Sequence, residues 1–158
     1  MSDPTLLILL DEVRGKTLRV LDGLTDAQAR WAPPGLQNTI LWHAGHSYVV
    51  VEWLTLKPLG REPHLPEGWH GMFSWDSRPA AVPADRWPPL AEVVGQLRWQ
   101  HGRLRHLIAG LSAEQLAARV PDNPGRTIAS AIVHGLHDEA RHSGEISLLR
   151  KLQGLPGS

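Results

Sequence analysis

The sequence contains no cysteine among its 158 residues. No disulfide can therefore form, no thiolate can bind a metal, and no thiol of the protein can act as a nucleophile. The chain also lacks an excess of charge of either sign, because 16 lysines and arginines balance 16 aspartates and glutamates. This balance argues against nucleic acids and membranes as partners, since anionic polymers and surfaces are bound through a surplus of positive charge.

Long hydrophobic runs are also missing. The apolar segment from Tyr48 to Val51 stops at Glu52, far short of the roughly 20 residues that a transmembrane helix needs. The first residues, MSDPTLLILLDEV, carry no positive charge ahead of their short apolar run, so they do not resemble a secretory signal. These features predict a cytoplasmic protein, and the length predicts a single domain over residues 1–158.

Four segments have the periodicity of long helices, and no segment alternates between polar and apolar residues as a half-buried strand does. The pattern predicts an all-α, four-helix bundle of the up-down-down-up type, built from two helix hairpins. A weak internal repeat fits this pairing, because TI followed by HAGH recurs as TI followed by HGLH after similar turns. The alternative explanation of this repeat is that loops of similar composition resemble one another without any duplication. The predicted helices cover residues 4–22, 39–57, 90–109 and 127–153.

A long loop rich in proline and tryptophan, from about residue 60 to residue 89, separates the second and third predicted helices. Loops of this length in compact domains are commonly functional. Its tryptophans are expected to hold the loop over the bundle and to form an apolar wall for a substrate; they are Trp69, Trp75 and Trp87. The tryptophans at helical positions are expected in the core; they are Trp42, Trp53 and Trp99.

The nine histidines of the chain are the most suggestive feature for chemistry. On the fourth predicted helix His142 follows Asp138 by four residues and Glu139 by three, and both spacings bring side chains together on one helix face. Imidazole and carboxylate groups in this arrangement suit a divalent metal. The same residues are also common as ion pairs on solvated surfaces, so this helix alone leaves both interpretations open.

His46 on the second predicted helix shares a stripe with Trp42 and Trp53, which is expected to face the core. A buried histidine needs a polar partner. One interpretation is a hydrogen bond to a backbone carbonyl or a carboxylate. The other is that His46 meets Asp138 and His142 across the bundle and completes a three-ligand metal site, as in catalytic rather than structural centres.

The remaining histidines have weaker signals. His43 is expected either to support the site or simply to pack. His134 and His137 are expected either to have no part in the site or to support it, and His134 lies one turn before Asp138. His101 and His106 show no partner pattern, so positions at the surface or at the edge of the core are expected for both.

Three motifs together carry a family resemblance: LWHAGHSYVVVEWL, GWHGMFSW and DEARHSGEISLLRK. In order and spacing they resemble the DinB-like superfamily of four-helix bundles over nearly the whole chain. The resemblance implies a divalent metal held by one histidine of the second helix and a pair four residues apart on the fourth, which corresponds to His46, Asp138 and His142. Many members have a histidine at the position of Asp138, whereas those resembling mycothiol-dependent maleylpyruvate isomerase have a carboxylate.

Two functional hypotheses follow. The first is a metal-dependent enzyme that uses Zn²⁺ or Ni²⁺, with Glu139 as the candidate general base because it lies beside His142 on the helical wheel. It would act on a small molecule, either as a thiol-dependent transferase or isomerase, with a low-molecular-weight thiol as cosubstrate, or as a hydrolase. The second is a non-catalytic bundle that binds a small molecule or a second protomer in a homodimer, with the histidines and carboxylates forming a structural polar network.

Overall fold

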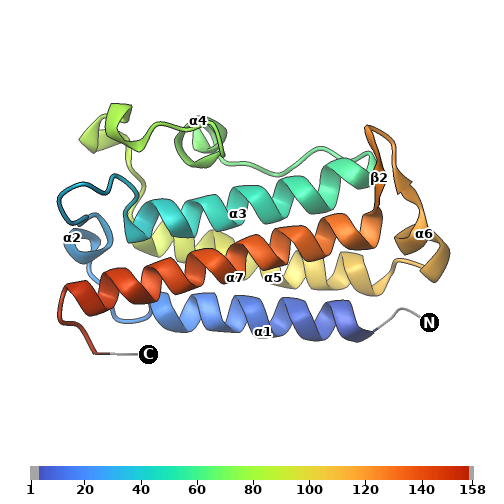
Figure 1. Cartoon of the computed structure of the whole chain (residues 1–158), viewed down its shortest axis with the longest axis horizontal. Coiled ribbons are helices and arrows are strands. Elements are labelled where there is room, and N and C mark those ends of the chain that lie inside the picture. Colours follow the sequence, from blue (N-terminus) through green and yellow to red (C-terminus); the bar gives the residue numbers. More distant parts are fainter. Residues whose placement is uncertain (1–3, 157–158) are drawn as a thin grey trace.

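The computed structural model describes residues 4–156. Four long helices dominate this part of the chain, and their ends lie close to the predicted ones; they are α1 (Pro4–Leu21), α3 (Ile40–Leu56), α5 (Leu90–Ala109) and α7 (Ile128–Leu152). In Figure 1, α1 and α7 run in one direction and α3 and α5 in the opposite one. The mostly helical fold agrees with the all-α class expected from the sequence.

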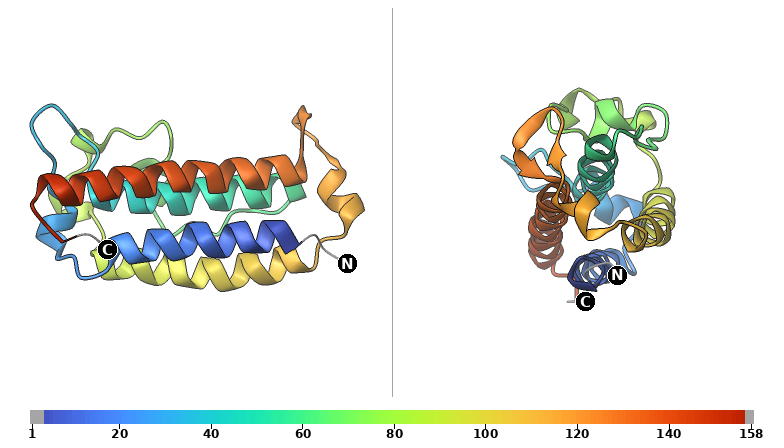
Figure 2. Two further views of the ribbon diagram at one scale, coloured as in Figure 1. Left: turned by 60° about the horizontal axis from the view of Figure 1, so that its bottom comes forward. Right: turned by 90° about the vertical axis from the view of Figure 1, so that its right-hand side faces the viewer.

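The four long helices pack around a common axis. Viewed from the end in Figure 2, α3 lies opposite α1, and α5 and α7 lie between them on either side. The packing agrees with this view, since α7 and α5 each contact both α1 and α3. Helix α3 therefore has long helices on two sides, and the segment between α3 and α5 covers a third.

Capping side chains explain where α3 and α7 begin. The Thr39 hydroxyl accepts a hydrogen bond from the backbone N–H of Trp42, and Thr127 forms a capping box with Ser130. These caps satisfy backbone donors that have no partner inside the helix. Capping boxes also begin the short helices α2 (Asp26–Ala29) and α6 (Ala113–Ala117), so the turns that precede α3 and α7 are alike in both halves of the chain.

The prediction that the chain contains no strand was wrong. A small antiparallel sheet joins β1 (Arg119–Val120) to β2 (Asn123–Thr127), with Arg119 opposite Thr127 and Val120 opposite Asn123. The strands are short and largely exposed, so no buried face imposes the apolar alternation by which strands are recognised. Backbone pairing across a tight turn, rather than burial, forms this hairpin.

The segment predicted as a long loop contains the short helical elements α4 (Trp69–Phe73), η2 (Pro79–Ala81) and η3 (Ala84–Arg86), and η1 (Lys57–Leu59) directly precedes it. Helix α4 packs on α3, and Trp69 and Phe73 are buried there. Figure 1 shows this segment crossing the outer side of α3. The segment is thus held against the bundle, as its tryptophans predicted, but by Trp69 and Phe73 rather than by three tryptophans equally.

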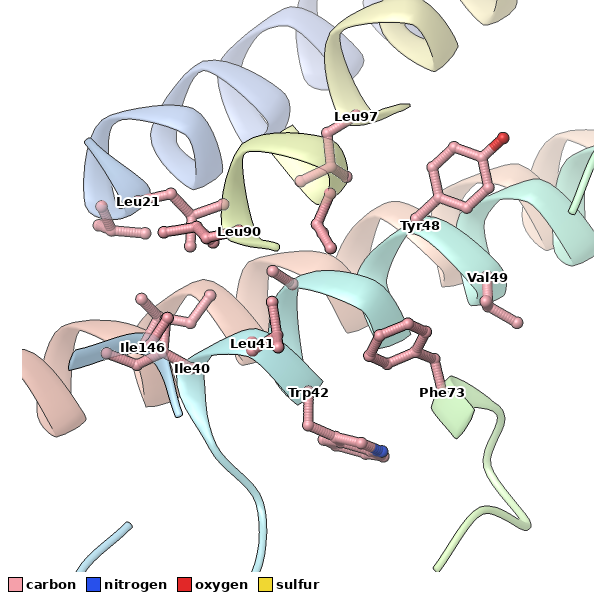
Figure 3. Close-up of a cluster of buried hydrophobic side chains, with 14 of the residues drawn as sticks. Leu21, Ile40, Leu41, Trp42, Tyr48, Val49, Phe73, Leu90, Leu97 and Ile146 are labelled. Atoms are coloured by element: carbon pink, nitrogen blue, oxygen red, sulfur yellow. The ribbon is translucent and has the colours of Figure 1, made fainter. Parts of the chain in front are cut away.

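Helix α3 is the centre of the core, because every residue from 40 to 52 is buried. Figure 3 shows why: Leu90 and Leu97 pack on one side of α3, while Trp42 and Phe73 lie on the other. A helix that is buried all round must also bury its polar residues, and these then need partners inside the protein. The histidines of α3 belong to this group.

Within residues 4–156, none of the helices combines the length and the apolar character needed to cross a bilayer.

Candidate metal site

The structure brings together the three side chains that the sequence singled out. His46 on α3 and the pair Asp138 and His142 on α7 each offer a ligand atom within 4.8 Å of the other two. Oδ2 of Asp138 lies 3.4 Å from Nε2 of His46 and 3.4 Å from Nε2 of His142. The close approach of α3 and α7 near Gly135, where an added Cβ would lie 3.4 Å from the Val51 backbone, makes these short distances possible.

The imidazole of His46 is held by a backbone carbonyl. Its Nδ1 lies 2.6 Å from the carbonyl oxygen of Phe73 on α4, and because a carbonyl can only accept, Nδ1 carries the proton. Nε2 then has a free lone pair directed towards Asp138. The ring of Trp42 stacks on His46 at 4.5 Å between centroids and 18° between planes, which fixes the ring in this orientation.

Gly45 explains how the Phe73 carbonyl comes so close. A Cβ at this position would lie only 2.4 Å from the Phe73 ring, so a side chain there would push α4 away from α3. The glycine in the HAGH motif therefore permits the contact that orients His46. The sequence contained this signal, but it did not reveal that the partner comes from the segment after α3.

His142 is held by His43, since their Nδ1 atoms lie 2.8 Å apart. Burial, followed by the nearby His142 and His46, lowers the pKa of His43 to about 3, so His43 is neutral at ordinary pH. The arrangement that frees Nε2 of His142 has its Nδ1 donating to Nδ1 of His43. Both ligand histidines then have a partner that fixes ring and tautomer, as is usual around protein metals. Of the two interpretations of His43, the supporting one agrees with this contact.

Asp138 is the residue that most needs a cation. Its Oδ2 is buried and has no hydrogen-bond partner among residues 4–156, while Oδ1 lies 3.6 Å from the exposed Arg141. Without a metal, burial opposes ionisation of Asp138, but hydrogen bonds and positive charge from His142 and His46 in their protonated forms outweigh it and hold the pKa of Asp138 well below its usual range. A buried carboxylate oxygen without a donor, facing two imidazole lone pairs, is costly unless a cation lies among them.

The donor set fits a metal in spacing as well as in chemistry. Ligand atoms about 2.0–2.1 Å from a tetrahedral ion lie about 3.3 Å apart, close to the two observed separations of 3.4 Å. Two imidazoles and one carboxylate are ligands that zinc and nickel accept. The residues present therefore fit a divalent transition metal.

Glu139 does not lie beside this cluster. Its fully buried carboxylate accepts hydrogen bonds from Nε and Nη2 of Arg14 on α1, at 2.8 and 2.9 Å. The helical wheel placed Glu139 near His142, but the two residues turn towards different neighbours: Glu139 towards α1, and His142 towards α3. The prediction of Glu139 as the general base is therefore wrong. Glu139 is a buried partner of Arg14 and has no access to a substrate.

Other expectations for the aromatic and histidine side chains were partly wrong. Trp99 is 50% exposed rather than in the core, and it packs against the Arg103 guanidinium. His101 has a partner after all, because its Nε2 lies 2.7 Å from Oδ1 of Asp11. In both cases the partner comes from another turn or another helix, which the local pattern did not indicate.

A pocket of about 340 Å³ opens beside the cluster. His46 and Asp138 form its polar end. The rest of its lining comes from α3, from α7 and from the second residue after α4; these lining residues are Val50, Trp53, Leu54, Trp75 and His134. His134 lies one turn before Asp138 and lines the same pocket. A small molecule in this pocket would contact two of the three cluster residues directly.

Comparison with known proteins gives a family match and a structural match. The profile of the DinB superfamily matches residues 9–146. A crystal structure described as the conserved protein of locus from Enterococcus faecalis is similar in fold, with a TM-score of 0.75 and 19% sequence identity over 96% of this chain and 97% of that one. No curated protein matches this chain.

Proposed function

The chain belongs to the DinB superfamily, and from this premise we propose that it binds one divalent transition metal through His46, Asp138 and His142. The candidate ions are Zn²⁺ and Ni²⁺, since both accept imidazole and carboxylate ligands. Three protein ligands are the number typical of catalytic metal sites. We therefore propose a metal-dependent enzyme rather than a structural metal protein.

The observation that carries the proposal is the buried Oδ2 of Asp138. It has no hydrogen-bond donor among the described residues and lies 3.4 Å from one nitrogen each of His46 and His142. A purely structural polar network would be expected to satisfy such an atom. A cation bound among the three atoms would satisfy the carboxylate oxygen and both imidazole lone pairs together.

The chain's own residues would prepare the site in three ways. The Phe73 carbonyl and neutral His43 orient the two imidazoles, and Trp42 covers one face of His46 and excludes water from it. When bound, the ion would act as a Lewis acid and lower the pKa of a thiol or water beside it. These features support chemistry on a small molecule that enters through the neighbouring pocket.

Two reaction classes remain candidates for this centre. One is transfer or isomerisation that uses a low-molecular-weight thiol, which would be a cosubstrate because the chain has no cysteine. The other is hydrolysis. An assay of the metal-loaded protein with an electrophilic substrate distinguishes them. Transfer consumes the free thiol in proportion to product, isomerisation requires the thiol but regenerates it, and hydrolysis proceeds without it.

The metal assignment is tested first by elemental analysis of protein purified without a polyhistidine tag. We expect about one transition metal per chain in the wild type and in His137→Ala, whose exposed histidine lies on the same helix. His142→Ala is expected to lose the metal while its circular dichroism spectrum stays helical. Wild-type protein that takes up no metal after incubation with zinc or nickel would contradict the proposal and favour the non-catalytic bundle.

A further inference from the structure

The pocket beside the cluster has a strongly apolar wall. Val50, Trp53 and Leu54 of α3 line it together with Trp75. Trp53 and Trp75 meet edge to face, with ring centroids 5.4 Å apart. The volume of about 340 Å³ is near the lower end of the range for small-molecule sites, so the pocket suits a group no larger than a substituted ring.

The two indole rings are held in place before any ligand arrives. The His70 ring packs on Trp53 at 5.2 Å and on Trp75 at 5.7 Å, and the Lys57 ammonium lies 5.2 Å from the centre of the Trp53 ring. Lys57 is itself paired with Glu62. A wall fixed in this way loses little conformational entropy when it binds a ligand.

Trp75 is nevertheless 51% exposed. An indole left half in water beside a concave site gains most if another apolar group covers it. The other half-exposed tryptophan of similar accessibility, Trp99 at 50%, is not among the residues that line this pocket. The two therefore form a matched pair for comparison.

Charge restricts the ligand further. No lysine or arginine of residues 4–156 lines the pocket, and its one carboxylate is that of Asp138. In the metal-free pocket, a phosphate or carboxylate group would meet the negative charge of Asp138 and no lysine or arginine. An uncharged group would meet apolar carbon and aromatic rings on most sides.

We propose that this pocket binds a small, uncharged aromatic group of the substrate against Trp53 and Trp75, with the polar end of the substrate directed towards His46, Asp138 and His134. The binding of an aromatic group is inferred from the pocket's own geometry, but the pocket's role as a substrate subsite rests on the proposed metal centre. Outside the cluster, His134 can donate or accept a hydrogen bond with the polar end, whereas the indole N–H groups of Trp53 and Trp75 can only donate.

The aromatic subsite is tested without metal by nuclear magnetic resonance of the tryptophan indole N–H groups, with benzyl alcohol as the probe. Trp75→Ala and Trp99→Ala each remove one indole signal and so assign it. We expect benzyl alcohol, with a dissociation constant of about 1 mM, to shift the Trp75 signal and leave the Trp99 signal unchanged. Phenyl phosphate is expected to leave both unchanged. Equal responses of Trp75 and Trp99 to benzyl alcohol, or none at Trp75, would overturn the proposal.

Metal-loaded protein then tests whether the pocket serves the proposed centre. Benzohydroxamate and acetohydroxamate share one metal-binding group and differ in phenyl against methyl. We expect the phenyl compound to bind about tenfold more tightly to wild type and to Trp99→Ala, but with most of this preference lost in Trp75→Ala. Equal affinities of the two hydroxamates for wild type would overturn the role as a substrate subsite. If neither hydroxamate binds although benzyl alcohol does, the proposal of a metal centre is contradicted, whereas the proposal of an aromatic binding pocket is retained.

Discussion

At the scale of single residues, the site depends on which nitrogen of each histidine carries its proton. The Phe73 carbonyl settles this for His46. The His43–His142 contact leaves Nε2 of His142 free when Nδ1 of His142 is the donor and Nδ1 of neutral His43 the acceptor. Asp138 supplies the negative charge between them. The supporting contacts are as necessary as the ligands, because an imidazole with the wrong tautomer would present a proton rather than a lone pair to a cation.

His43 makes the stability of the metal-free protein depend on pH. Its pKa is about 3 when folded, chiefly because of burial, against an ordinary value of 6.5. Between these values the unfolded chain binds a proton that the folded protein does not, so the free energy of unfolding decreases as the pH falls. From pH 6.5 to pH 4.5 this residue alone should remove about 2 kcal/mol. Urea denaturation in the presence of chelator, across this range, measures the loss.

The control for this pH dependence is His43→Phe, which has no group to titrate at that position. Its free energy of unfolding should decrease by about 2 kcal/mol less than that of the wild type over the same interval. The same pH slope in both proteins would show that His43 is not the group responsible.

At the scale of elements, the decisive contact is between α3 and α4. Helix α4 has only five residues and is held because Trp69 and Phe73 are buried against α3. Gly45 allows the Phe73 ring to lie directly on the α3 backbone. This packing places the Phe73 carbonyl at His46, so a short helix in an otherwise irregular segment becomes part of the site.

Gly45→Ala should separate α4 from α3. The new Cβ would lie 2.4 Å from the Phe73 ring, so the ring and its carbonyl must move. We expect a loss of about 1–3 kcal/mol in the free energy of unfolding and weaker metal binding, measured by chemical denaturation and by competition with a chelator. Gly102→Ala on α5 is the control, because nothing lies within 4 Å of its added Cβ; it should be neutral or stabilising by up to about 1 kcal/mol. Similar losses in both variants would contradict this account of Gly45.

At the scale of the whole molecule, a buried polar network joins all four long helices. Arg14 of α1 binds Glu139 of α7 and Gln100 of α5, and Gln100 donates to Glu52 of α3. Glu52 also accepts from Arg103 and from the backbone N–H of His64, the last of which ties down the segment after α3. Because each group has its partner on a different helix, the network favours one mutual arrangement of the helices.

Glu139→Gln tests whether that residue stabilises the bundle or takes part in the chemistry. It removes the charge that compensates the fully buried Arg14, so we expect the free energy of unfolding to decrease by about 3–5 kcal/mol. Metal affinity of the folded variant should stay within about threefold of wild type, because Glu139 does not touch the cluster. Chemical denaturation and metal titration measure the two effects. Glu145→Gln, exposed on the same helix, should change stability by less than about 0.5 kcal/mol; an equal change in both variants would contradict a structural role for Glu139.

The sequence by itself determined the helices and the spacing of the pair on α7. Helical periodicity and capping depend on residues three or four apart, so the ends of α3 and α7 and the common face of Asp138 and His142 follow from local order. The burial of His46 followed as well, because it lies in an apolar stretch of α3.

Only the tertiary structure decided which groups these side chains meet. The carbonyl that fixes His46 comes from 27 residues further along the chain, and Arg14 and Glu139 are 125 residues apart. Neighbours on a helical wheel can turn towards different helices, which is why Glu139 joins the core while His142 joins the cluster. The β1–β2 hairpin and the exposed Trp99 escaped prediction for the related reason that their partners and their burial are set by packing, not by local pattern.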